Sequence, residues 1–146
     1  MNASTSARAV ARRELTQAIT AEARQQIAEH GADGLSLRAI ARELGMASSA
    51  LYRYFPSRDD LLTALIIEAY TALGDAIEAA DARVDPSDVT RRWLAMCRTV
   101  RAWAWRQPHE YALLYGSPVP GYRAPADTID PAARIPLALL GPLRDG

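Results

Sequence analysis

Two short segments on either side of Gly45 constrain most strongly what this chain can fold into. Residues 37–44 carry apolar side chains at the spacing of one helix face, and a second short helix is expected over residues 48–54. Ser36 can cap the first of these helices, and Gly45 ends it. Two helices joined by a turn of about three residues form a helix-turn-helix. The segment therefore predicts a small helical domain at the front of the chain.

The rest of the chain also has a helical pattern. No segment alternates between apolar and polar residues for long enough to predict a strand, so the expected fold class is all-α, with about seven helices. The first long helix places Leu15, Ile19, Ala23 and Ile27 on one face. This first helix is expected over about residues 12–29. The helices after the helix-turn-helix are expected over about residues 58–81 and 86–107, from Pro108 to Tyr115, and from about residue 132.

Local signals mark where several elements begin. Ser57 is expected to cap the fourth helix, with Asp60 at its third position. Asp85 is expected to cap the fifth helix, and Pro86 to occupy its first turn. Residues 116–131 contain four prolines and two glycines, which predicts a long loop. A loop of this length in a compact domain is expected to have a function or to pack against another segment.

Composition excludes several classes of protein. Hydrophobic residues make up 49% of the 146 positions, which is enough for a core, and no apolar run approaches the roughly 20 residues that span a bilayer. The N-terminus lacks the apolar stretch of a signal peptide, so a soluble cytoplasmic protein is expected. Cys97 is the only cysteine, which excludes an internal disulfide and a cysteine-based zinc cluster. We expect no metal and no cofactor.

Charge is distributed unevenly along the chain. Residues 1–58 hold eight arginines and five acidic residues, giving +3, whereas residues 59–146 hold nine arginines and twelve acidic residues, giving −3. A basic front half suits an anionic partner. The asymmetry alone is weak support for one, because solvated faces often differ by a few charges.

The second helix of the helix-turn-helix has the composition of a helix that reads DNA. In this motif the second helix lies in the major groove, with its N-terminal residues against base edges. Small side chains let the backbone approach the groove, Ser48 and Ser49 can bond to bases, and Arg53 can contact a base or a phosphate. These residue types favour DNA binding.

Three further residues favour contacts to the DNA backbone. The hydroxyl groups of Tyr52 and Tyr54 can bond to phosphates while their rings pack on the domain. Arg58 lies at the start of the next helix, where backbone N–H groups already attract phosphate. The alternative is structural, because two short helices with a glycine turn also occur in proteins that bind no DNA, and either tyrosine alone is more often a half-buried aromatic.

Residues 34–66 closely resemble the DNA-binding segment of the TetR family of bacterial transcriptional regulators. The family pattern has a helix containing IA..LG, a Gly-Val-Ser turn and then LY.HF.(S/N)K..L. The matching positions, in order, are Ile40, Ala41, Leu44, Gly45, Leu51, Tyr52, Phe55, Ser57 and Leu61. The departures are Met46 for valine, Ala47 for serine, Tyr54 for histidine and Arg58 for lysine. Without a serine at position 47, a cap or phosphate contact there falls to Ser48.

The resemblance implies an N-terminal three-helix DNA-binding domain joined by a long helix to a helical ligand-binding and dimerisation domain. The expected boundaries are residues 1–56, with a flexible arm at 1–10, and residues 57–146. The resemblance also implies a homodimer that binds a palindromic operator in double-stranded DNA, usually as a repressor, and is released by a small, largely apolar effector. Carried over position by position, the groove and base residues are Ser36, Arg38, Ser48, Ser49 and Arg53, and the phosphate residues are Tyr52, Tyr54 and Arg58.

The back half carries a second resemblance. Residues 93–125 resemble the C-terminal domain of a TetR subgroup often labelled WHG-type, in which HP..Y.L.yG.PVPGY.AP recurs. Family members usually continue with two further long helices that form the dimer interface, so either the second domain is short or the sequence is incomplete at its C-terminus. If the chain is this short, dimerisation is expected to use the helices around residues 89–107 and 132–141.

Aromatic and polarisable side chains in this half could line a largely apolar ligand cavity. The candidates are Tyr70, Trp93, Met96, Val100, Trp103, Tyr111 and Tyr115. At helical spacing such residues more often form plain core, which we weigh above ligand lining. His109 could contact a ligand, although a local hydrogen bond is favoured. Cys97 is better explained as a small buried hydrophobic residue than as a nucleophile.

Two other functions stay open from the sequence alone. One is a small-molecule binding or sequestering protein with an unused DNA head, which salt-dependent DNA binding would distinguish from a regulator. The other is an enzyme, which is disfavoured because the sequence shows no acid–base pair or activated nucleophile. The expected partners are therefore operator DNA, a small-molecule effector and a second copy of the chain, with no membrane.

Overall fold

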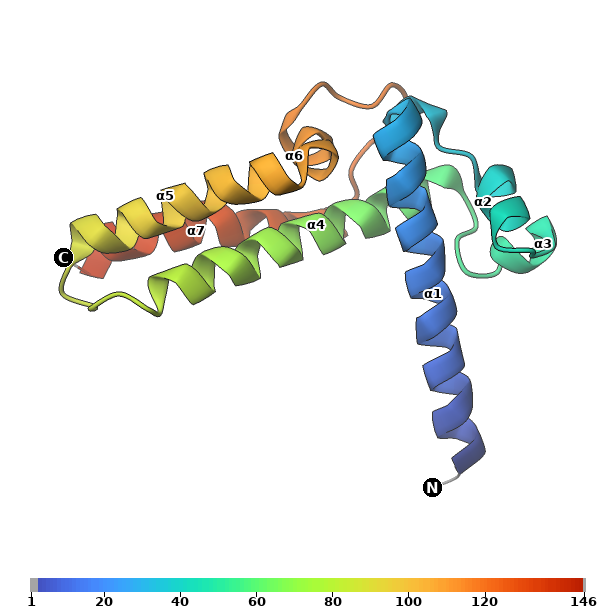
Figure 1. Ribbon diagram of the computed structural model, residues 1–146, viewed down its shortest axis with the longest axis horizontal. Helices are drawn as coiled ribbons and strands as arrows, with labels where there is room; N and C mark the ends of the chain where they lie inside the picture. Colours follow the sequence, from blue (N-terminus) through green and yellow to red (C-terminus); the bar gives the residue numbers. More distant parts are fainter. Residues whose placement is uncertain (1–2, 146) are drawn as a thin grey trace. The chain divides into compact units, whose positions relative to one another are not determined.

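The computed structural model describes residues 3–145 and confirms the all-α fold class. Over these residues the chain forms seven α-helices and two short 3₁₀ turns, with no strand (Figure 1). The helices are α1 Ala3–His30, α2 Leu37–Glu43, α3 Ser48–Leu51, α4 Arg58–Asp81, α5 Val89–Arg106, α6 Pro108–Tyr115 and α7 Ile129–Asp145, and the 3₁₀ turns are η1 Ala32–Gly34 and η2 Ala126–Thr128.

Two compact units divide the chain inside α4, between Ala64 and Leu65. The sequence pattern places the domain boundary earlier, at residues 56–57. The division lies further along because the first turns of α4 carry Leu61 and Leu62, which belong to the first unit and are fully buried. α4 therefore contributes to the core of both units.

The long helix α1 supplies one wall of the first unit. Its predicted apolar stripe is confirmed at Ile19, Ala23 and Ile27, which are all buried. The helix begins at Ala3, whereas the sequence pattern places its start near residue 12 and a flexible arm before it. Residues 3–11 contain four alanines and no glycine or proline, so the helix propagates toward the N-terminus. Residues 1 and 2 of the expected arm lie outside the described residues.

Buried residues from several elements close this first core opposite α1. They are Leu35, Leu37, Ile40, Ala41, Leu51, Phe55, Leu61 and Leu62. The short helices α2 and α3 each bury one side and leave the other exposed. Helices of four and seven residues are unstable alone, so this burial keeps α2 and α3 in place.

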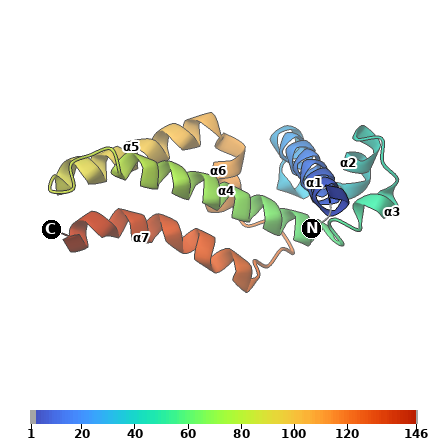
Figure 2. The same cartoon turned by 90° about the horizontal axis from the view of Figure 1, so that it is seen from below.

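Three helices of the second unit enclose its core. The residues that form this core are Ala69, Leu73 and Ile77 of α4, Met96 and Trp103 of α5, and Ile135 of α7. Figure 2 shows these three helices running alongside one another, and α6 continues from the end of α5. The segment between α6 and α7 is the long loop that the sequence predicts, and Gly121 provides its turn with φ of 77°.

The start of α5 differs from its prediction. Asp88, not Asp85, is the cap, because its side chain accepts the Arg91 N–H at 2.9 Å. Asp85 instead accepts both the N–H and the hydroxyl of Ser87, at 2.9 and 2.6 Å. Those two bonds form a local turn that precedes the helix, so Pro86 lies in the turn and outside α5.

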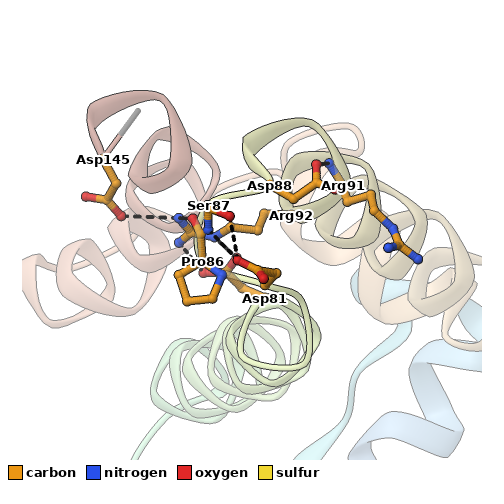
Figure 3. Close-up of polar contacts among 8 residues, drawn as sticks. Asp81, Pro86, Ser87, Asp88, Arg91, Arg92 and Asp145 are labelled. Atoms are coloured by element: carbon orange, nitrogen blue, oxygen red, sulfur yellow. Dashed lines mark hydrogen bonds and ion pairs between the residues drawn. The ribbon is translucent and has the colours of Figure 1, made fainter.

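Arg92 joins the ends of three helices in the second unit (Figure 3). Its Nε and Nη2 atoms donate to the two carboxylate oxygens of Asp81, at 2.7 and 2.9 Å. Its Nη1 atom donates to the Pro86 carbonyl at 3.3 Å and to Asp145 at 3.4 Å. The Arg92 guanidinium lowers the pKa of the Asp81 carboxyl through these hydrogen bonds. This contact connects α4, α5 and α7 at one end of the unit.

A second arginine links α7 to the side of α4. Arg134 donates to Asp75 at 2.7 Å and to both carboxylate oxygens of Glu78, at 3.0 and 2.8 Å. Its guanidinium lies over Gly74, where an added Cβ would be 3.1 Å from the central guanidinium carbon. An alanine at position 74 would therefore require the Arg134 guanidinium to shift by a few tenths of an ångström.

Candidate nucleic-acid interface

Hydrogen bonds around Gly45 fix the turn between α2 and α3. The Gly45 N–H donates to the Arg42 carbonyl at 3.1 Å, and the Met46 N–H donates to the Ala41 carbonyl at 2.8 Å. Gly45 adopts φ of 64°, which is a left-handed conformation that glycine tolerates best. This pair of bonds is a Schellman motif. The predicted end of α2 at Gly45 is confirmed.

Two serines cap the helices on either side of the reading helix. The Ser36 hydroxyl accepts the Ala39 N–H at 3.3 Å and so begins α2. The Ser57 hydroxyl accepts the Asp60 N–H at 3.1 Å and donates to the Asp60 carboxylate at 2.6 Å, which begins α4. Both predicted caps are confirmed. The Gln26 side chain also accepts the Ser36 N–H at 3.1 Å, which attaches α2 to α1.

The reading helix α3 is shorter than predicted. Its helical bonds end after four residues, and residues 52–54 continue as tighter turns in which the Tyr54 N–H donates to the Leu51 carbonyl at 2.9 Å. Pro56 drives Phe55 out of the helical conformation, so the helical segment cannot extend past residue 54. Ala47 begins α3 without a side-chain cap, as its departure from the serine of the family pattern suggests.

The predicted DNA residues all lie in the first unit and divide by exposure. The exposed members are Arg38, Ser49, Tyr52 and Arg53, and the half-buried members are Ser36, Ser48, Tyr54 and Arg58. They come from the ends of α2 and α4 and from α3 with the turn after it. The eight residues therefore lie on elements that follow one another along the chain, from the start of α2 to the start of α4.

Arg58 is engaged inside the first unit. Its Nη2 atom donates to the Ala32 carbonyl at 2.9 Å and lies 4.0 Å from the Asp33 carboxylate. Its Nε atom is buried without a hydrogen-bond partner. About one third of the side chain, 32%, is exposed. These contacts hold the turn after α1 against the start of α4, which is a role that the sequence did not predict for Arg58.

An arginine of α1 also reaches this surface. The Arg12 guanidinium carbon lies 5.1 Å from the centre of the Tyr54 ring, which is a cation–π distance. Sequence reasoning did not include Arg12, because it placed the start of α1 at this residue. The signal that could have found it is the spacing of Arg12 from Ile19, seven residues or two helical turns along the same face.

Comparison with known proteins agrees with this geometry in both units. Residues 19–65 match the family model for bacterial regulatory proteins of the tetR family. Residues 93–146 match the model for the tetracyclin repressor-like C-terminal domain. The chain belongs to the TetR family. Its two matched segments fall in the helix-turn-helix unit and in the second unit.

Relatives of this TetR chain include proteins of known name and solved structure. An HTH-type transcriptional regulator of Mycobacterium tuberculosis is 49% identical over 130 residues, covering 86% of this chain and 54% of the relative. The crystal structure of a regulatory protein designated SCO4313 is 40% identical, with a TM-score of 0.83, over 91% of this chain and 63% of that one. The TetR family transcriptional regulator PfmR of Thermus thermophilus has a TM-score of 0.63 at 26% identity, over 88% of this chain and 69% of that one. The chain spans about half the length of the curated relatives it matches.

The second unit of this TetR chain contains a cavity of about 520 Å³. Ile66 and Tyr70 of α4 line it on one side, and Leu114 of α6 on another. The loop between α6 and α7 contributes Val119 and Tyr122. None of the lining residues carries a charge. The long proline-rich loop thus lines a cavity together with α4 and α6, which agrees with the expectation that it packs against another segment.

The structure separates the seven residues that the sequence proposes for a cavity. Tyr70 lines the 520 Å³ cavity, whereas Val100 and Tyr111 line a shallower hollow of about 370 Å³ beside Cys97. The remaining members are Met96 and Trp103, which are buried in the core, and Trp93 and Tyr115, which are 41% and 47% exposed. Sequence reasoning missed the loop residues that line the larger cavity, because which of them face the cavity depends on how the loop folds back.

Tyr70, which lines the larger cavity, belongs to a cluster of three tyrosines. The Tyr115 ring meets Tyr70 edge-on, with centres 6.0 Å apart, and lies 5.1 Å from the Tyr111 ring. Burial raises the pKa of Tyr70, and burial together with the neighbouring tyrosines raises the pKa of Tyr115. Both hydroxyls therefore stay protonated at neutral pH and can donate hydrogen bonds.

Two further features of the described residues concern membranes and metal ions. None of the helices there is both long enough and apolar enough to cross a bilayer. Residues 3–145 also hold no group of three or more histidine, cysteine, aspartate or glutamate side chains placed to bind a metal ion. His109 is exposed at the start of α6, and Cys97 is partly buried on α5.

Proposed function

We propose that this chain is a DNA-binding transcriptional regulator whose first unit reads one half of a palindromic operator. The observation that carries the proposal is the helix-turn-helix itself, capped at Ser36 and turned at Gly45, which leaves Ser49, Tyr52 and Arg53 exposed. Serine and arginine side chains suit base edges, and tyrosine hydroxyls suit phosphates. Its partner is double-stranded DNA, so its place of action is the nucleoid in the cytoplasm.

Action as a homodimer is the second part of the proposal. A palindromic operator requires two copies related by twofold symmetry, because each head reads one half-site. Exposed apolar side chains on α7 support a self-complementary interface. Leu137, Leu140 and Leu143 follow one another at helical spacing and are 66%, 57% and 62% exposed. Such a stripe is unfavourable in water, and a second copy could cover it.

Repression relieved by a small ligand is the third part. The cavity in the second unit has the size of many small-molecule sites, and its uncharged lining with tyrosine hydroxyls suits a small, largely apolar effector. α4 begins in the first unit and ends in the second, so it connects the reading head to this cavity. A ligand that binds one arrangement of α4 more tightly would shift the population by that difference in affinity, and no more.

The test is a fluorescence anisotropy titration with DNA from immediately upstream of the protein's own gene, against scrambled DNA, across a salt series. Selective binding that weakens as salt rises supports the proposal. Arg53→Gln should lower selective affinity by about 5- to 150-fold and relax the base preference at one position. Arg98→Gln, which removes the same charge from α5, serves as the matched control and should leave selectivity unchanged.

A small-molecule binding protein with an unused DNA head is the rival function. The uncharged cavity fits this rival equally well, so the cavity does not separate the two. DNA binding does, because a sequestering protein has no reason to prefer one duplex over another. Equal affinity for upstream and scrambled DNA, at a dimeric mass measured by light scattering, would favour the rival.

A further inference from the structure

The inner side of α1 changes character toward the N-terminus. Ile19, Ala23 and Ile27 lie on this side and are buried in the first unit. Two helical turns before Ile19 the same side carries Arg12, and one turn before that it carries Arg8. Both arginines are exposed. Both arginines therefore belong to the N-terminal turns of α1, which Figure 1 shows extending past α2 and α3.

The contact with Tyr54 fixes which way this side faces. The Arg12 guanidinium carbon lies 5.1 Å from the centre of the Tyr54 ring. Tyr54 follows the reading helix and is one of the residues proposed to contact phosphate. Arg12 therefore places a permanent positive charge beside the proposed DNA-binding surface. Arg8, four residues earlier, lies about 6 Å further along the same side of α1.

No acidic group of this segment neutralises the two arginines. Residues 3–13 contain three arginines and no aspartate or glutamate. The next acidic residue, Glu14, projects about 200° around the helix from Arg12, which is the opposite side. Solubility would be served by arginines on any side of α1. Their position on the side of Tyr54 instead indicates an anionic partner that reaches this surface.

We propose that Arg8 and Arg12 bind phosphates of the DNA backbone immediately outside the half-site that α3 reads. The inference rests on the proposed function, since it extends the same DNA-binding surface. A rigid helix presents its side chains to the backbone and does not thread into the minor groove as an extended arm does. Each protomer then contacts more duplex than its helix-turn-helix alone covers.

The test compares salt dependence on two duplexes. The probe is the highest-affinity duplex recovered from a random-sequence pool, prepared with flanking base pairs and again trimmed to the two half-sites. On the flanked duplex, Arg8→Gln and Arg12→Gln should each lower the slope of log affinity against log salt by about one per bound protomer. On the trimmed duplex neither should change it. Arg8 is exposed, so its variant should fold normally.

Two matched variants separate this site from a general charge effect. Arg13→Gln removes the same charge about 100° around α1 from Arg12, and it should keep the wild-type slope. Arg12→Lys keeps a positive charge over Tyr54 and should also keep the slope. An equal loss in Arg13→Gln would show a net-charge effect and overturn the proposal.

The remaining outcomes distinguish the inference from the function on which it rests. Wild-type slopes for Arg8→Gln and Arg12→Gln, with selective binding retained, would overturn the inference alone. A preference for A·T over G·C in the flanks would overturn the phosphate assignment, because it indicates reading of the minor groove. Wild-type protein without salt-dependent DNA binding would overturn the proposed function, and the inference with it.

Discussion

The polar contacts of the two units differ in range. In the first unit the starts of α2 and α4 are set by bonds between residues three apart, such as Ser57 with Asp60, and Arg58 reaches the Ala32 carbonyl across 26 positions. In the second unit arginines join helices that are distant in sequence, and Arg134 reaches Asp75 across 59 positions. The contrast suits their proposed roles, because a reading head needs a fixed local shape and an effector unit needs helices whose connections can change.

Core packing should give the largest effect and should show whether the units are independent. Leu73 is fully buried in the second unit, and Leu73→Ala should lower the free energy of unfolding by about 2 to 5 kcal/mol. All three tryptophans of the chain lie in this unit, so tryptophan fluorescence during urea unfolding reports its stability. The shift in that transition is the measurement.

Ile40→Ala is the matched change in the first unit, where Ile40 is also fully buried. It should cost a similar free energy, seen by circular dichroism, while the tryptophan transition stays in place. If Ile40→Ala and Leu73→Ala shift the tryptophan transition equally, the two units unfold as one and the contrast between them fails.

The buried arginine should matter more than the exposed one. Arg92 is nearly buried, with 10% of its side chain exposed, and Arg92→Gln should cost about 1.5 to 3 kcal/mol because its hydrogen bonds to Asp81 are charge-assisted. Arg134 is 31% exposed and its partners more so, hence Arg134→Gln should cost less than about 1 kcal/mol. Thermal unfolding of both variants measures the difference, and the reverse order would contradict this explanation.

A glycine in each unit tests local conformation. Gly45 has φ of 64°, so Gly45→Ala should destabilise the first unit by about 1 to 2 kcal/mol. Gly141 lies inside α7 directly before Pro142, so the helix propensity that Gly141→Ala adds, about 0.5 to 1 kcal/mol, is opposed by crowding of the new Cβ against the proline ring, and the stability of the second unit should change by less than about 1 kcal/mol. Urea midpoints check both predictions. Stabilisation by Gly45→Ala would show that the left-handed turn is absent in solution.

The same difference in range decides what could be predicted from the sequence. The capping serine at position 36, the glycine turn at 45 and the pair Ser57 and Asp60 each depend on residues within four positions, and all are confirmed. The core stripe of α1 was likewise readable from its spacing. The lengths of α1 and α3 were not, because the propagation of α1 through its N-terminal alanines and the change from helix to tighter turns after Leu51 depend on small differences in local stability.

Long-range contacts were beyond sequence reasoning. Nothing near Arg92 indicates that it pairs with Asp81 and Asp145, because the pairing exists only once α4, α5 and α7 are side by side. For the same reason the proline-rich loop was seen as unusual, while the cavity that it covers was not located. Arg12 was missed for two reasons. The start of α1 was placed at this residue, and its contact with Tyr54 joins residues that are far apart in sequence.

Acid should weaken the second unit through Asp81, with the smallest effect of those considered. The hydrogen bond from Arg92 lowers the pKa of the Asp81 carboxyl below its ordinary value of 3.8. The unfolded chain therefore binds a proton there more readily than the folded chain does. The stabilisation from Asp81 is fully present above the pKa that this carboxyl has in the unfolded chain. It is lost as the pH falls through the lower pKa that the carboxyl has in the folded chain. Tryptophan-detected stability of the wild type should decline below about pH 4, and Asp81→Asn, which has no carboxyl to protonate, should start lower and decline less steeply. Parallel declines in the two proteins would mean that another carboxyl governs acid unfolding, and that the α4–α5–α7 junction at Arg92 holds the second unit together less than its geometry indicates.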